Sequence, residues 1–128
     1  LSVMKIIGFE NSSVINSDWI RAYSSPFPDR ASCKGGIEFP LDIHLQRAFE
    51  YIIEGLETGN IDVLKTKPAM LAVGLKDHAI HPENQIADFK GLFPDAPINT
   101  FEQAGHFCQE DIPEILVPLI HQFIQANP

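Results

Sequence analysis

The sequence is poor in cysteine, tryptophan and positive charge, and each shortage excludes a class of protein. Its 128 residues include 2 Cys and 1 Trp, with 9 Lys and Arg against 17 Asp and Glu. The two cysteines, Cys33 and Cys108, are too few for a disulfide framework and fit a reducing cytoplasm. A net charge of −8 without any basic run argues against nucleic acid as a partner.

Long apolar runs are also missing. No stretch approaches the ~20 residues that a bilayer-spanning helix needs, so no membrane partner is expected. The first residues, LSVMKIIGFENSS, have too short an apolar part for a signal peptide, and a cytoplasmic location is predicted. A hydrophobic content of 45% nevertheless indicates a chain that buries a core.

The first part of the chain, residues 1–67, carries the irregular features. A short helix is expected around SDWIRAY, with Ser17 or Asp18 as its N-cap. Prolines and the pair Gly35-Gly36 argue against any long regular element in SSPFPDRASCKGGIEFP. This segment is therefore expected to consist of loops and short helices.

The segment LDIHLQRAFEYIIEGLETGN, residues 41–60, is the clearest predicted helix. Asp42 can cap its start, and Gly59 or Asn60 can end it in the left-handed conformation. Apolar residues recur at helical spacing and predict one face turned to the core, made by Leu45, Ala48, Phe49, Ile52, Ile53 and Leu56.

Residues 68–128 alternate strands with helices. AMLAVG (69–74) is apolar without alternation and predicts a strand buried on both faces, and PINTFE (97–102) predicts a second strand. Helices are expected over 82–92, with Pro82 in the first turn, and over 111–126, bent or broken by Pro118. This βαβα order predicts two parallel strands.

Two parallel strands make a poor sheet by themselves, because three or more strands are normally needed for a stable one. The only other plausible strand in the chain is MKIIGF, near the N-terminus. We therefore expect the sheet to be completed by residues that lie outside this sequence.

A carboxylate and an imidazole follow the two predicted strands. Asp77 lies in GLKDHAI and His106 lies in AGHF. The carboxyl ends of parallel strands meet at one edge of the sheet, where ligands bind. Asp77 can then accept a hydrogen bond from His106 and fix its tautomer, as the acid and base of a catalytic triad do. Taken singly, each has a structural alternative, as a loop residue or as an interior histidine.

The third member of such a triad is missing from the sequence. The motif G-x-S-x-G and its near variants are absent. Cys108 follows His106 too closely, and a reactive thiol needs a lowered pKa for which the sequence gives no cause. His78 and His81 next to Asp77 could suggest zinc, but a zinc site takes three or four protein ligands. No further cluster of ligands is evident, so neither a metal nor a cofactor is expected.

Four segments in a fixed order resemble the C-terminal part of haloalkane dehalogenases, which have the α/β-hydrolase fold. They are DWIRAYSSPFPD, GIEFP, LAVGLKD and AGHFCQED. The resemblance implies an α/β fold class and the C-terminal portion of an α/β-hydrolase fold. Residues 1–67 would be a partial helical cap, and residues 68–128 would be the last two parallel strands of the core with their helices.

The resemblance also implies roles for individual residues. Asp77 would be the triad acid, and His106 the base that activates water against an alkyl-enzyme ester, without metal or cofactor. Six residues would line the substrate pocket: Phe39, Pro40 and Ile43 in the cap, and Ala79, Ile80 and Phe107 beside the acid and the base. In such enzymes the nucleophilic aspartate, the oxyanion hole and the halide-holding tryptophans precede the matched region, and Trp19 does not match a halide-binding position.

Two hypotheses from different classes follow. In the first, the chain is the acid–base half of a haloalkane dehalogenase-like hydrolase, and a complementing N-terminal half provides the nucleophile for a small apolar halogenated substrate. In the second, the chain is a non-catalytic remnant or binding module that covers its open strand edge by forming a homodimer.

Overall fold

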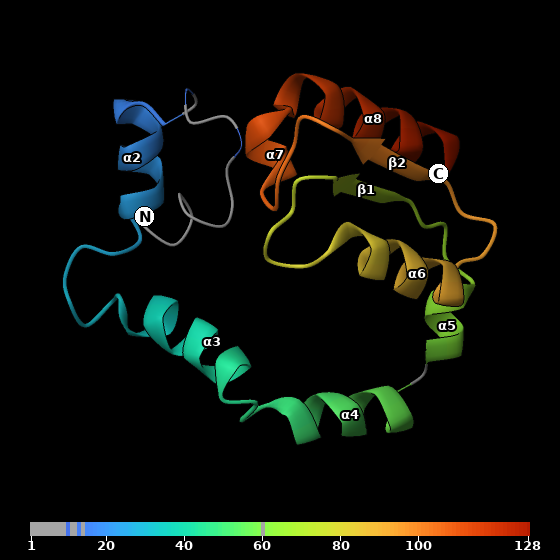
Figure 1. Ribbon diagram of the computed structural model, residues 1–128, viewed down its shortest axis with the longest axis horizontal. Coiled ribbons are helices and arrows are strands. Elements are labelled where there is room, and N and C mark those ends of the chain that lie inside the picture. Colours follow the sequence, from blue (N-terminus) through green and yellow to red (C-terminus); the bar gives the residue numbers. More distant parts are fainter. Residues whose placement is uncertain (1–9, 11–12, 14, 60) are drawn as a thin grey trace. The chain divides into compact units, whose positions relative to one another are not determined.

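The computed structural model describes Glu10, Ser13, residues 15–59 and residues 61–128, and Figure 1 labels their helices and strands. The expected strand MKIIGF lies outside the described residues. The chain divides into two compact units. Residues 15–64 form the first, called the helical unit below, and residues 65–128 with Glu10 and Ser13 form the second, called the sheet unit.

The helical unit begins with α2 (Ser17–Ser24). Its N-cap is Asn16, whose side chain accepts hydrogen bonds from the backbone N–H groups of Asp18 and Trp19. The prediction of Ser17 or Asp18 as cap was therefore wrong by one or two positions. Asparagine is as good a cap as serine or aspartate, because its side-chain oxygen reaches the same unsatisfied N–H groups. Trp19 is buried and stacks on Tyr23 with ring centroids 4.2 Å apart.

A regular helix, α3 (Lys34–His44), occupies part of the segment in which only short elements were expected. It starts just before Gly35-Gly36 and runs through Pro40. A proline within a helix removes one backbone hydrogen bond, here the bond to the carbonyl of Gly36, while the rest of the ladder can persist. The prediction was wrong because it treated each breaker as sufficient to end a helix.

The helix expected over 41–60 is interrupted. After α3 the chain turns at residues 45–48, and α4 covers only Phe49–Thr58. Gln46 has φ 53°, a left-handed conformation that a right-handed helix cannot contain. Asp42 lies inside α3 rather than at a helix start, and its carboxylate pairs with Arg47 at 3.3 Å. Gly59, with φ −70°, does not end α4 in the left-handed conformation, and Asn60 lies outside the described residues.

The apolar stripe predicted for the core is exposed. Phe49, Ile52 and Leu56 are 53%, 53% and 54% exposed, and α4 contains no buried residue. The helical spacing of these residues is present, but within the helical unit no layer covers this face of α4. The short helix α5 (Ile61–Lys65) follows.

The sheet unit contains the predicted parallel pair. β1 (Leu71–Gly74) and β2 (Ile98–Phe101) run parallel, with Leu71 opposite Ile98 and Gly74 opposite Phe101. Both strands are shorter than expected, but the βαβα order and the strand direction are confirmed. In Figure 1, α6 (Pro82–Leu92) and α8 (Pro113–Ala126) lie on opposite sides of the strand pair. Pro82 stands in the first turn of α6, as predicted.

The final helix is divided differently from the expectation. A one-turn helix, α7 (Cys108–Asp111), precedes α8, and α8 continues through Pro118. Pro118 removes only the bond to the carbonyl of Glu114 in the first turns of α8, so the helix is not broken there. A bend, the other effect expected of Pro118, stays a prediction. Among the described residues of this unit, the buried apolar core is formed by Val73, Ala104, Ile112 and Leu116. None of the described helices is long and apolar enough to span a bilayer.

Candidate active site

The loops that follow β1 and β2 are held together by their backbones. The N–H of Leu75 donates to the carbonyl of Phe101 at 2.8 Å, and the N–H of Lys76 donates to the carbonyl of Ala104 at 3.0 Å. Gly74 is buried at this crossing, and a Cβ built on it would overlap the carbonyl oxygens of Ala104 and Gly105. The glycine therefore allows the two loops, the acid loop after β1 and the base loop after β2, to lie in direct contact.

This contact brings the two predicted catalytic side chains together. Nδ1 of His106 lies 3.0 Å from Oδ2 of Asp77, so the predicted hydrogen-bonding distance is confirmed. Asp77 is buried at 6% exposure, while the side chain of His106 keeps 31% of its surface exposed. A buried carboxylate thus faces an imidazole that solvent can reach, which suits an acid that orients a base.

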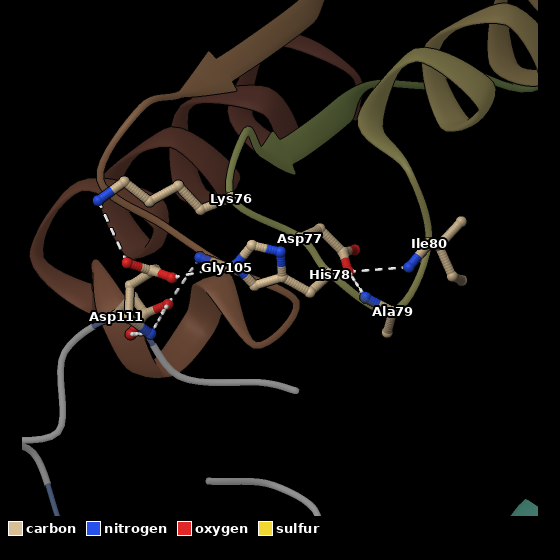
Figure 2. Close-up of polar contacts among 8 residues, drawn as sticks. Lys76, Asp77, His78, Ala79, Ile80, Gly105 and Asp111 are labelled. Carbon is tan, nitrogen blue, oxygen red and sulfur yellow. Dashed lines mark hydrogen bonds and ion pairs between the residues drawn. The ribbon is translucent and has the colours of Figure 1, made fainter. Parts of the chain in front are cut away.

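The carboxylate of Asp77 is fixed by donors on both oxygens. Oδ1 accepts the backbone N–H groups of Ala79 at 2.8 Å and Ile80 at 2.9 Å (Figure 2). Oδ2, which faces His106, also accepts a hydrogen bond from Nε2 of Gln85 at 2.8 Å. Burial raises the pKa of Asp77, but hydrogen bonds from the backbone of Ile80 and the ring of His106 outweigh burial, and the pKa lies below its ordinary value.

The lowered pKa of Asp77 predicts a pH-dependent stability. The ionised carboxylate is favoured by folding, so its stabilisation is present above the unfolded pKa of about 4 and is lost as the pH falls through the folded pKa. We expect Asp77→Asn to reduce the free energy of unfolding at neutral pH, by an amount that shrinks on acidification. Urea denaturation at several pH values measures this difference. The exposed Asp95→Asn is the control, and a difference that stays constant down to about pH 2 would contradict the prediction.

A second buried carboxylate holds the base loop. Asp111, 5% exposed, accepts the backbone N–H of Gly105 at 2.8 Å, next to His106. It also accepts the backbone N–H of Glu10 at 3.1 Å, and the carboxylate of Glu10 pairs with Nζ of Lys76 at 3.2 Å. Asp111 and Glu10 therefore connect the base loop, the acid loop and a segment far away in the sequence.

The thiol of Cys108 is unsuited to act as a nucleophile. Burial raises the pKa of Cys108, and the negative charges of Asp111 and Asp77 raise it further. A thiol is nucleophilic as its thiolate, which this environment disfavours.

The described part of the chain gives no support to a zinc site at His78. Nε2 of His78 lies 3.6 Å from Oε1 of Glu10. Among the described residues, no group of three His, Cys, Asp or Glu side chains is placed to hold a metal ion.

Comparison with known proteins gives relatives for most of the chain. It is 30% identical over 109 residues to a cis-3-alkyl-4-alkyloxetan-2-one decarboxylase of Xanthomonas campestris pv. campestris, a match that covers 84% of this chain and 36% of that enzyme. It is 32% identical over 102 residues to haloalkane dehalogenase 2 of Mycobacterium bovis and to that of Mycobacterium tuberculosis, covering 79% of this chain and 35% of each enzyme. The chain is a distant, partial homologue of these α/β-hydrolase enzymes.

The homology agrees with the observed fold. The two parallel strands and their helices match a C-terminal portion of the α/β-hydrolase homologues, and the chain spans about a third of their length. No protein-family model matches the chain, and no solved structure matches it.

The residues predicted to line a substrate pocket fall into both units. Phe39 and Pro40 lie on α3 with exposed side chains, Phe39 at 68%, and the side chain of Ile43 lies outside the described part of the chain. Ala79 and Ile80 are exposed beside Asp77, which uses their backbone N–H groups. Phe107 is half-buried, and its ring meets His106 edge-on with centroids 5.0 Å apart. Their substrate-binding role stays a prediction.

Sequence reasoning missed three residues that shape the site: Gly74, Gln85 and Asp111. Gly74 ends an apolar strand and Asp111 closes the acidic run QED, which are weak signals by themselves. Gln85 gave no signal, because a glutamine in the first turns of a helix is unremarkable. Its role is visible only in the structure, where the acid loop places Asp77 within hydrogen-bonding distance of Gln85 in α6.

Proposed function

We propose that this chain provides the acid and the base of an α/β-hydrolase of the haloalkane dehalogenase type, which acts on small apolar halogenated substrates. The observation that carries the proposal is the 3.0 Å contact between Asp77 and His106 at the carboxyl ends of two parallel strands. The homology to haloalkane dehalogenase 2 supports the choice of reaction.

The proposed chemistry assigns each nitrogen of His106 a role. With the Nδ1 proton donated to Asp77, Nε2 carries the lone pair and can take a proton from water. A carboxylate from outside this sequence would first displace halide from the substrate carbon and form an alkyl-enzyme ester. Water activated by His106 would then attack the carbonyl carbon of this ester and release the alcohol, while Asp77 stabilises the imidazolium.

A chimera tests this proposal. The matched C-terminal portion of Mycobacterium bovis haloalkane dehalogenase 2 is replaced by this chain, and halide release from 1-bromobutane is measured. We expect the chimera to release halide with repeated turnover, and the 128-residue chain alone to release none. The sequence has no G-x-S-x-G motif, and the raised pKa disfavours the thiolate of Cys108.

The dehalogenase missing the same portion is the matched control. A chimera that unfolds cooperatively yet releases no halide would contradict the proposal. Size-exclusion chromatography of the chain alone then bears on the non-catalytic alternative, which the exposed apolar face of α4 favours. A stable dimer together with an inactive, folded chimera would support self-association in place of catalysis.

A second activity is favoured by the decarboxylase match, which covers a larger share of this chain. That relative is named for acting on a cis-3-alkyl-4-alkyloxetan-2-one. Loss of carbon dioxide from such a four-membered lactone leaves an alkene, and no halide is involved. The same chimera, assayed separately with 1-bromobutane and with a dialkyl oxetanone, distinguishes the two activities. A dehalogenase releases bromide from the bromoalkane, whereas a decarboxylase forms an alkene from the oxetanone.

A further inference from the structure

The amide of Gln85 contacts the acid at the oxygen that also faces the base. Nε2 of Gln85 donates to Oδ2 of Asp77 at 2.8 Å and to the carbonyl of Ile80 at 2.8 Å. Both partners are pure acceptors, so only the amide nitrogen can face them, and its orientation is fixed by chemistry. Gln85 itself is held in the first turns of α6, where its backbone N–H donates to the carbonyl of His81 at 3.2 Å.

This arrangement completes the coordination of the carboxylate. Oδ1 accepts two backbone N–H groups, and Oδ2 accepts the amide of Gln85 beside the ring of His106. A carboxylate has about four lone-pair directions, and all four are used here. The carboxylate therefore cannot rotate away from His106 without breaking several hydrogen bonds at once.

The chemical nature of the donor also matters. Two of the described titratable side chains interact electrostatically with Asp77. His106 on the base loop lowers the pKa of Asp77, and the charge of Asp77 raises the pKa of Cys108 at the start of α7. Gln85 approaches from α6 as a neutral donor. A cationic donor at this position would cancel the charge that Asp77 offers to an imidazolium, whereas an amide orients the carboxylate and leaves its charge intact.

We infer that Gln85 is a positioning residue, which holds Asp77 in the orientation that keeps the proton of His106 on Nδ1 and the lone pair on Nε2. The inference rests on the proposed function for its catalytic meaning. Its structural content, the state of the His106 ring, is measurable without substrate or nucleophile.

The test is NMR of the 128-residue chain labelled with ¹⁵N-histidine, at about pH 8 where an ordinary imidazole is neutral. In the unmodified chain the ¹⁵N shifts should show the Nδ1–H tautomer of His106. In Gln85→Met, which keeps the volume of the side chain but removes the donor, we expect the Nδ1 proton to exchange with water about tenfold faster. The Nε2–H tautomer should also appear. Gln85→Glu, of the same size, cannot donate when ionised and also adds a negative charge that repels the carboxylate of Asp77, so it should disturb the His106 ring at least as strongly.

The matched control is Gln122→Met on α8, an exposed position at which the tautomer should not change. An unchanged His106 tautomer and exchange rate in folded Gln85→Met and Gln85→Glu would overturn the inference. Loss of the folded state in both variants, with Gln122→Met folded, would also overturn it, because Gln85 would then be a structural residue. An inactive chimera with responsive His106 signals would instead reject the proposed function alone.

Discussion

Replacing His106 with alanine in the chimeric enzyme is expected to lower steady-state halide release by about 10²–10⁴-fold, the usual contribution of a general base. The imidazole is held 3.0 Å from the buried carboxylate of Asp77 and retains an exposed edge from which water can be deprotonated. Without it, the second chemical step has no proton acceptor. The first step, displacement of halide by a carboxylate, needs no base and should still occur.

Because halide displacement precedes ester hydrolysis, loss of the base alone should give a distinct kinetic pattern. His106→Ala should release about one equivalent of bromide per enzyme and then stop, because the ester is not hydrolysed. Mass spectrometry of the intact variant should show the added alkyl group. His121→Ala, an exposed histidine on α8, is the control and should turn over normally. Loss of the first equivalent together with turnover would show that His106 does not act in ester hydrolysis.

The parts of the fold that the sequence predicted are those in which local pattern and tertiary packing agree. AMLAVG and PINTFE lie between helices, so their order alone gives two parallel strands, and the structure has them at Leu71–Gly74 and Ile98–Phe101. The helix over 41–60 failed because one residue, Gln46, is left-handed. Nothing in the identity of a glutamine predicts that conformation. The ion pair between Arg47 and Asp42, which spans this turn, is likewise not evident from the sequence.

The candidate site divides in the same way. Asp77 and His106 were predictable because residues that follow parallel strands converge at one edge of the sheet. Gln85 and Asp111 were not, because each meets its partner through a loop whose path depends on several backbone hydrogen bonds. Helical spacing likewise predicted which residues of α4 share a face, but not whether anything covers that face.

Gly74→Ala is expected to destabilise the sheet unit and to separate the acid from the base. The added Cβ would overlap the carbonyl oxygens of Ala104 and Gly105, which are backbone atoms of the base loop and cannot rotate away as a side chain could. Crowding of this kind costs about 1–3 kcal/mol or more, a large part of the ~5–15 kcal/mol that stabilises an ordinary domain. Urea denaturation measures the loss, and the Nδ1 proton of His106 reports whether its contact with Asp77 remains.

Gly91→Ala gives the matched control, with an effect of opposite sign. Gly91 lies in α6 with no atom within 4 Å of a built Cβ, so alanine should stabilise the helix by about 0.5–1 kcal/mol. Comparison of the two Gly→Ala variants thus separates the general effect of replacing a glycine from the crowding of Gly74 against the base loop. If Gly74→Ala were as stable as the unmodified chain and kept the Nδ1 proton, the two loops would not need to pass so closely. The acid–base contact would then depend on the side chains around Asp77 rather than on the end of β1.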